Sequence, residues 1–153
     1  MIRHANTDDA SRIAEILVFT KRMNYRRIFH DDRFSFGELQ VYPLAKSFIE
    51  EPGRLTGFWV FDDEFVKGVV HIEGKEIREL YVDTFFENQG IGSRLIDFAV
   101  GRGCEFLWVL EKNDAAIRFY RRHGFELTDE RKRQGDTTEY IVKMFRKSGE
   151  LSQ

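Results

Sequence analysis

The chain has 153 residues, of which 42% are hydrophobic and 33% charged, which is the composition of one soluble globular domain with a core of its own. Its 24 basic and 26 acidic side chains leave a formal net charge of −2, which excludes the one-signed field of a nucleic-acid or anionic-membrane binder. No apolar run approaches the roughly 20 residues of a membrane-spanning helix, so we expect neither a nucleic-acid nor a membrane partner.

The first predicted elements are a short strand over residues 1–5 and a helix over residues 6–23. Thr7 is the expected N-cap of this helix, because a hydroxyl at that place accepts a hydrogen bond from an amide of the first turn. Asp8 and Asp9 follow in the first turn, where the positive end of the helix dipole stabilises carboxylates.

Residues 24–53 show a less regular pattern. A second helix is expected within residues 37–53, interrupted near Pro43 because a proline inside a helix lacks the amide that the helix needs. Pro52 and Gly53 are expected to end it.

Residues 55–83 are rich in the residue types that strands favour. Three such runs are separated by Asp62-Asp63 and by Gly74-Lys75, and both pairs are typical of turns. We expect an antiparallel meander of three strands. A helix is expected next over residues 90–103, followed by a buried strand over residues 105–111.

The last predicted elements are a helix and a hairpin. The helix covers residues 113–124, with Asn113 as its N-cap and Gly124 at its C-terminal end. The hairpin covers residues 125–147 and turns around Gly135-Asp136. The order is strand, helix, helix, three strands, helix, strand, helix and two strands. It predicts an α/β fold with a single mixed, mostly antiparallel sheet flanked by helices.

Cys104 is the only cysteine, which excludes a disulfide within the chain. Its apolar neighbours predict a half-buried structural thiol rather than a nucleophile. Residues 1–13 lack the apolar segment of a secretory signal, so we expect a cytoplasmic protein.

Residues 89–93, Gln-Gly-Ile-Gly-Ser, follow a predicted strand and begin a predicted helix. A helix N-terminus has amides without partners and a partial positive charge, and glycines let the backbone approach a ligand closely, so this combination suits a phosphate. The third glycine of a dinucleotide motif is missing, and so is the Gly-Lys-Ser/Thr of a P-loop. Taken alone, the segment fits a pyrophosphate site or a capped helix with a glycine turn.

Residues 107–126, with an Asn at the helix start and a Phe-Tyr followed by Gly-Phe, resemble the second signature of the GNAT superfamily, the Gcn5-related N-acetyltransferases. Residues 76–95 resemble its coenzyme A loop, whose usual form is Gln/Arg-x-x-Gly-x-Gly/Ala. The two blocks stand in the order of the family, and residues 2–17 resemble its first strand and helix. The resemblance implies a GNAT-like acyl-CoA N-acyltransferase fold as a single domain over residues 1–147, with a frayed tail at 148–153.

One position departs from the loop motif, because Glu87 stands where the family has Gln or Arg. A carboxylate beside a pyrophosphate is unfavourable unless it points into solvent or pairs with a cation. Arg94 is a possible partner, so we expect weaker affinity rather than loss of the site. Asn88 stands where Gly is frequent, and Asn tolerates the left-handed conformation better than most residues.

The resemblance implies acetyl-CoA as a co-substrate. The peptide groups of Leu80 and Val82 would contact the acyl end and the pantetheine. Asn113 would reach the pantetheine, act only as an N-cap, or do both. The amides expected to hold the pyrophosphate are those of Gln89, Gly90, Ile91, Gly92, Ser93 and Arg94.

The resemblance also implies the catalytic groups. An alkyl amine with a pKa near 10.4 must lose a proton before it attacks a thioester. Glu76 stands at the position of a base or a water-holding carboxylate, with Glu79 as the competitor that only a bulge could bring to the same face. Tyr120 aligns with a tyrosine that protonates the departing thiolate, and this role is preferred to that of a core aromatic, which its helix would also allow. The amide of Leu80 would serve the oxyanion, and attack would be direct, with no acyl-enzyme.

The acceptor is expected to bind near residues 24–39. This region combines aromatic and acidic side chains that suit a cation with Arg26, Arg27 and Arg33, which would suit a carboxylate. A small-molecule amine such as a polyamine or an amino-sugar is the first expectation, ahead of a protein N-terminus or a lysine. A non-catalytic acyl-CoA sensor is the alternative from another class. We expect no metal site, because no ligand spacing surrounds His30 or His71, and a monomer or a homodimer.

Overall fold

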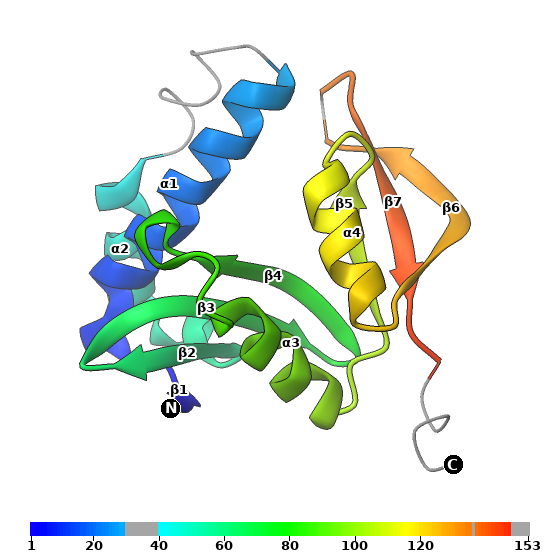
Figure 1. Cartoon of the computed structure of the whole chain (residues 1–153). Helices are drawn as coiled ribbons and strands as arrows, with labels where there is room; N and C mark the ends of the chain where they lie inside the picture. Colours follow the sequence, from blue (N-terminus) through cyan, green and yellow to red (C-terminus); the bar gives the residue numbers. More distant parts are fainter. Residues whose placement is uncertain (30–39, 136, 148–153) are drawn as a thin grey trace.

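The computed structural model of the protein describes residues 1–29, 40–135 and 137–147, with the backbone alone for residues 24–29. Within these residues the strands form one sheet in the order β1-β2-β3-β4-β5-β7-β6 (Figure 1). The strands are β1 (Ile2–His4), β2 (Phe58–Asp63), β3 (Phe65–Glu73), β4 (Glu76–Val82), β5 (Phe106–Leu110), β6 (Glu126–Arg133) and β7 (Tyr140–Phe145). The α-helices are α1 (Ala10–Phe29), α2 (Val41–Glu50), α3 (Ile91–Gly101) and α4 (Asp114–Arg122). The short 3-10 turns are η1 (Thr7–Asp9), η3 (Pro52–Leu55) and η4 (Thr84–Phe86).

The sheet is mixed and mostly antiparallel, as the order of elements predicted. Only β4 and β5 run parallel to each other, and the remaining neighbours are antiparallel. The predicted order of strands and helices is confirmed. The tail expected at residues 148–153 lies outside the described residues.

Helices cover both faces of the sheet, and each face has its own core. The neighbouring residues Val69 and Val70 point to opposite faces, as successive strand residues must. Val69 packs in a cluster with α1 and α2, and Val70 packs in a cluster with α3 and α4. Cys104 belongs to the second cluster and is 3% exposed, so it is buried more deeply than the sequence predicted. Burial raises the pKa of its thiol to about 11, which disfavours the reactive thiolate.

Two details near the helix starts correct the sequence prediction. The N-cap of the first turn is Asn6 rather than Thr7, because Asn6 Oδ1 accepts from the Asp8 amide at 2.9 Å. The Asp9 carboxylate accepts from the Asn6 amide in return, also at 2.9 Å, which completes a capping box. Pro43 does not interrupt the second helix. It lies in the first turn of α2, where an amide has no helical acceptor to lose.

The reversal between β2 and β3 also lies one residue later than predicted. Asp62 and Asp63 still pair with β3, and the chain turns at Glu64, whose φ of 70° is left-handed. The turn expected at Gly74-Lys75 separates β3 from β4 as predicted. In the described part of the chain, no helix combines the length and the apolarity needed to cross a bilayer.

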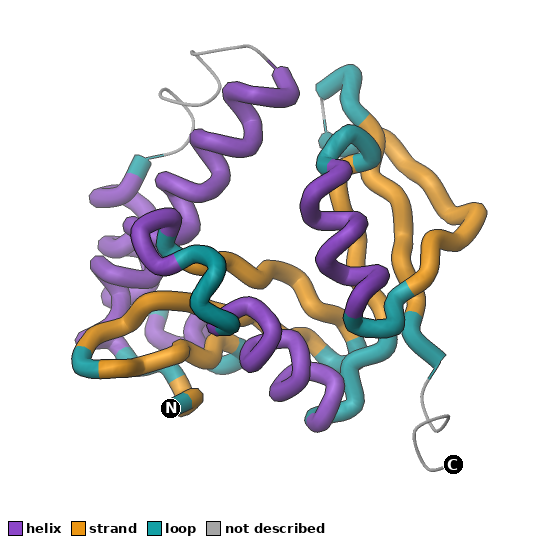
Figure 2. The backbone as a smooth tube through the Cα atoms, in the orientation of Figure 1, coloured by secondary structure: helices purple, strands orange, loops and turns teal. Residues whose placement is uncertain are grey.

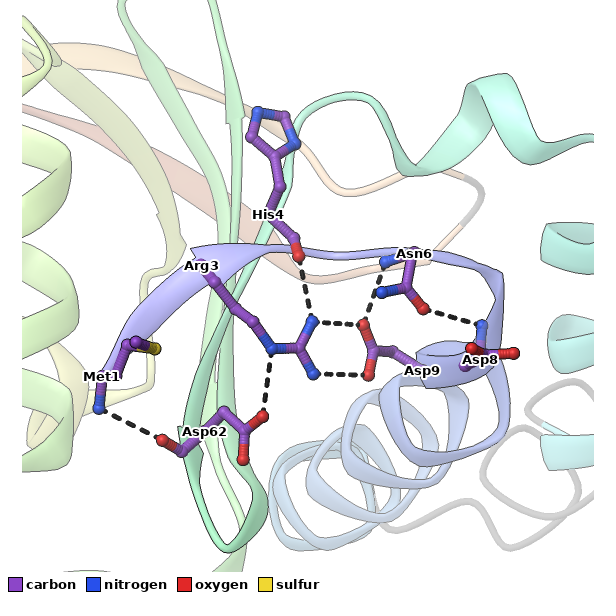
Figure 3. Close-up of polar contacts among 7 residues, drawn as sticks. All are labelled: Met1, Arg3, His4, Asn6, Asp8, Asp9 and Asp62. Carbon is purple, nitrogen blue, oxygen red and sulfur yellow. Dashed lines mark hydrogen bonds and ion pairs between the residues drawn. The ribbon is translucent and has the colours of Figure 1, made fainter.

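An ion-pair network joins the first strand to the first helix (Figure 3). The Arg3 guanidinium donates to both oxygens of Asp9, each at 2.9 Å, and to Asp62 Oδ2 at 3.0 Å. The hydrogen bonds from Arg3 hold the pKa of Asp9 below its usual range, against the opposing effect of burial. Because that pKa is lowered by folding, the stabilisation is present at neutral pH and is lost as the pH falls.

Asp9→Ala is expected to lower the free energy of unfolding by about 2 kcal/mol at pH 7, because it removes the cap and leaves Arg3 without its main partner. The difference from the unchanged protein should shrink as the pH falls below about 4, the ordinary pKa of an aspartate. Urea denaturation at several pH values measures both effects. Asp8→Ala is the matched control, because Asp8 is exposed, and an equal loss in that variant would contradict this account.

Candidate active site

A cavity lies where β4 and β5 separate. The two strands pair only at Glu76 with Phe106 and at Ile77 with Leu107, and beyond these residues they diverge (Figure 1). The divergence follows a bulge at Arg78, where β4 carries an extra residue relative to β3. A bulge bends its strand and increases the local twist. Residues of β4, β5 and α4 line the resulting cavity of about 650 Å³.

The peptide groups of Leu80 and Val82 point toward this opening. The Asp83 amide donates to the Lys67 carbonyl of β3 at 2.9 Å, which fixes the direction of its peptide group. Backbone groups alternate along a strand, so those of Leu80 and Val82 face away from β3 and toward β5. Because β5 has already diverged, none of the described strands pairs with these groups on that side.

Helix α3 begins after the loop that follows β4 (Figure 2). Asn88 and Gly90 both adopt left-handed conformations, with φ of 64° and 82°. This turn leads the chain into α3, whose first amides, those of Ile91, Gly92 and Ser93, have no acceptor within the helix. Such a terminus is suited to an anion.

Two expectations about Arg94 need correction. Its amide donates to the Gly90 carbonyl at 3.1 Å as the first bond of α3, so it is not free for a ligand. Its guanidinium lies over the ring of Phe61, 5.8 Å from the centroid, rather than beside Glu87. Glu87 is instead exposed, which places its charge in solvent. The charge of Glu87 is therefore exposed to solvent and needs no cationic partner.

Helix α4 supplies two polar side chains to the cavity. Asn113 is the N-cap of α4, since its Oδ1 accepts from the Ala116 amide at 3.2 Å, and it also lines the cavity. Tyr120 lies on the cavity wall beside the core aromatics Phe119 and Phe125. Burial raises the pKa of Tyr120 to about 12, so its hydroxyl keeps its proton at physiological pH.

The bulge also brings Glu76 and Glu79 to one face of the sheet. Glu76 pairs with Glu73 and Glu79 pairs with His71, and the extra residue between them restores the alternation. Both line the cavity. The Glu76 carboxylate is 20% exposed and lies 3.8 Å from Arg78 Nη1.

Glu79 has a different environment from Glu76. Its carboxylate lies 2.6 Å from Lys21 Nζ and 3.6 Å from His71 Nδ1. Burial opposes its ionisation, but His71 and Lys21 together outweigh burial and hold its pKa below the usual range. A carboxylate stabilised as an anion in this way is the poorer base, which leaves Glu76 as the better candidate.

The sequence profile of the acetyltransferase (GNAT) domain matches residues 48–127, which is more than half of the chain. The chain belongs to the GNAT acetyltransferase domain family. An uncharacterized N-acetyltransferase of Methanocaldococcus jannaschii is 39% identical over 83 residues, which cover 50% of this chain and 37% of that protein. An uncharacterized N-acetyltransferase of Lactobacillus delbrueckii subsp. lactis is 30% identical over 95 residues, which cover 58% of this chain and 55% of that protein. The chain therefore spans only part of each of these two relatives.

Solved structures share the GNAT fold over nearly the whole chain. Apo-form YjaB from Escherichia coli superposes with a TM-score of 0.75 at 20% identity, and the match covers 95% of each chain. The PaiA N-acetyltransferase from Thermoplasma acidophilum, solved in complex with coenzyme A, superposes with a TM-score of 0.64 at 19% identity. That match covers 95% of this chain and 98% of the other.

Some lining residues of the GNAT cavity were missed from the sequence. Lys21, Arg54 and Lys132 come from three separate elements, and nothing in their local pattern marks them. His71 and Glu79 could have been paired had the register of β3 and β4 been known. The acceptor region expected at residues 24–39 lies outside the described side chains. The described residues hold no group of three or more His, Cys, Asp or Glu placed to bind a metal ion.

Gly90→Ala is expected to lower the free energy of unfolding by about 1 kcal/mol, because an L-residue is strained in the left-handed conformation. Gly101→Ala on the same helix is the matched control. Gly101 is in ordinary helical conformation, and an added Cβ would meet no atom within 4 Å. That variant should raise the free energy of unfolding by about 0.5 kcal/mol. Equal effects of the two variants in chemical denaturation would contradict the role given to the Gly90 turn.

Proposed function

We propose that the protein transfers the acetyl group of acetyl-CoA to the primary amine of a small molecule. The observation that carries the proposal is the opening between β4 and β5, where Leu80, Glu76 and Tyr120 line one cavity and the peptide group of Val82 continues the unpaired edge of β4. The family and the fold agree with it. The PaiA enzyme of the same fold was solved with coenzyme A.

The donor would lie along the open edge of β4. Its pantetheine arm would hydrogen-bond to the peptide groups of Leu80 and Val82, which lack a strand partner there. Its pyrophosphate would accept from the amides at the N-terminus of α3, and Gln89 and Gly90 belong to the turn before them. The side-chain amide of Asn113, whose oxygen caps α4, has donors left for the pantetheine.

The amine would first lose a proton to Glu76, directly or through water, because the ammonium form has no lone pair with which to attack. The nitrogen then forms a bond with the thioester carbon, and the amide of Leu80 stabilises the oxyanion. As the C–S bond breaks, the Tyr120 hydroxyl donates to the departing sulfur. The nitrogen then loses its second proton, which restores the hydroxyl of Tyr120, and Glu76 releases the first proton to solvent. The products are an amide, a free thiol and one proton.

The raised pKa of Tyr120 keeps its hydroxyl protonated, which excludes a phenolate base, and it also makes the hydroxyl a weaker acid than an ordinary phenol. A hydroxyl with a pKa of about 12 stays protonated at neutral pH. Cys104 takes no part, because it is buried in the core and does not line the cavity. Attack is therefore proposed to be direct, with no acyl-enzyme.

Tyr120→Phe is expected to lower kcat on the order of 100-fold, as the loss of a general acid does, with little change in the KM for acetyl-CoA. The assay measures thiol release from acetyl-CoA with polyamines, aminoglycosides, amino acids and short peptides as acceptors. Tyr140→Phe makes the same chemical change on β7 outside the cavity and should leave kcat unchanged. Cys104→Ala should retain turnover.

An unchanged kcat in Tyr120→Phe would overturn the role of this residue. Binding of acetyl-CoA without turnover of any acceptor would favour the non-catalytic sensor. Loss of turnover in a folded Cys104→Ala variant would contradict direct attack.

A further inference from the structure

A second cavity of about 620 Å³ adjoins the first on the α1 and α2 side of the sheet. Four side chains line both cavities: Lys21, Arg54, His71 and Glu79. A molecule whose amine reaches the first cavity can therefore extend past these side chains into the second one.

Three of the four shared side chains form one group, in which His71 Nδ1 is buried without a hydrogen-bond partner among the described residues. Glu79 lies within ion-pair distance of both Lys21 and His71, as described above. The ring of His71 also stacks on Phe58 with a centroid separation of 4.1 Å. The charges of Lys21 and Glu79 therefore offset each other, and neither stands alone where the two cavities adjoin.

Arg54 is the shared side chain without an acidic partner. Its guanidinium donates to the Ser47 hydroxyl and lies over the ring of Phe48, 5.0 Å from the centroid. In the part of the chain that the structure describes, no carboxylate lies within ion-pair distance of it. Lys132 is the other cation without such a partner at the first cavity, but it lies over Trp108 and does not line the second. Arg54 is thus the charge that an acceptor spanning both cavities would meet.

The remainder of the second cavity is lined by apolar side chains together with the polar Thr56 and Glu73. Leu17, Leu44, Phe48 and Phe58 line it together with backbone of the turn at Gly53. A planar guanidinium held by a hydroxyl and an aromatic ring is prepared to bind a carboxylate through two parallel hydrogen bonds. The apolar walls suit a hydrocarbon side chain.

The geometry points to Arg54 as the residue that binds the carboxylate of the acceptor, so that the acceptor is an amino acid with an apolar side chain. This inference rests on the proposed acetyl transfer and narrows its substrate.

The test compares each amino acid with the amine that lacks its carboxylate. L-phenylalanine is paired with phenethylamine and L-leucine with 3-methylbutylamine, and initial rates of thiol release give kcat and KM. The amino acids should have the higher kcat/KM. Arg54→Gln should raise their KM on the order of 10- to 100-fold, as expected for one charged hydrogen-bonding partner. It should leave the KM for phenethylamine and for acetyl-CoA unchanged.

Two further variants separate a direct contact from a general effect of charge. Arg54→Lys keeps the charge and should restore part of the affinity. Lys46→Gln removes a positive charge from the exposed face of α2, outside both cavities, and should leave the KM of the amino acids unchanged. An equal rise of KM in Lys46→Gln would overturn the contact.

The failure of this inference is distinguishable from the failure of the proposed function. If acetyl-CoA gives no thermal stabilisation and no heat in calorimetry, the proposed function itself fails. If acetyl-CoA binds but neither amino acid binds to the complex with coenzyme A or is acetylated, the inference alone fails. It also fails if the amines are used as well as the amino acids, or if Arg54→Gln leaves the KM of the amino acids unchanged.

Discussion

The bulge at Arg78 is the constraint on which the arrangement of the site depends. It follows directly on the last pair between β4 and β5, so β4 leaves its parallel neighbour with backbone groups that no other strand satisfies. Buried backbone groups require partners, so a strand that opens in this way is stable only where water or a ligand can reach it. The same extra residue turns Glu79 to the face that carries Glu76.

The helices on the two faces of the sheet contribute different groups to the proposed reaction. Helices α3 and α4 cover one face, and between them they supply the amides of the glycine turn, Asn113 and Tyr120. The packing between these helices is close, because an added Cβ on Gly92 would meet the ring of Phe119 at 3.3 Å. Helices α1 and α2 cover the other face. Lys21 of α1 and Arg54 of η3, which follows α2, line the second cavity.

Local patterns allowed most of the elements to be predicted. The glycine turn, the Asn113 cap and the order of strands and helices all follow from residues that are close in sequence. Some local details were predicted wrongly because two neighbouring residues can serve the same purpose. Asn6 and Thr7, for example, are both suited to be the N-cap, and the structure uses Asn6.

The parts that could not be predicted depend on contacts between distant residues. The register that places His71 beside Glu79 is set by pairing along the whole of β3 and β4, and a bulge shifts it without a clear local signal. Lys21 reaches Glu79 only once α1 packs on the sheet. Arg94 turned to Phe61 rather than Glu87 because an aromatic ring from β2 lies within its reach, and this contact is likewise long-range.

The central claim is that the open edge of β4 receives acetyl-CoA, and a titration followed by backbone amide NMR tests it most directly. The account predicts that the largest shifts fall on the amides of Leu80, Val82 and Gly92, while those of β1 at the far edge of the sheet stay in place. Saturable shifts confined to another surface, or none at any concentration of acetyl-CoA, would contradict it.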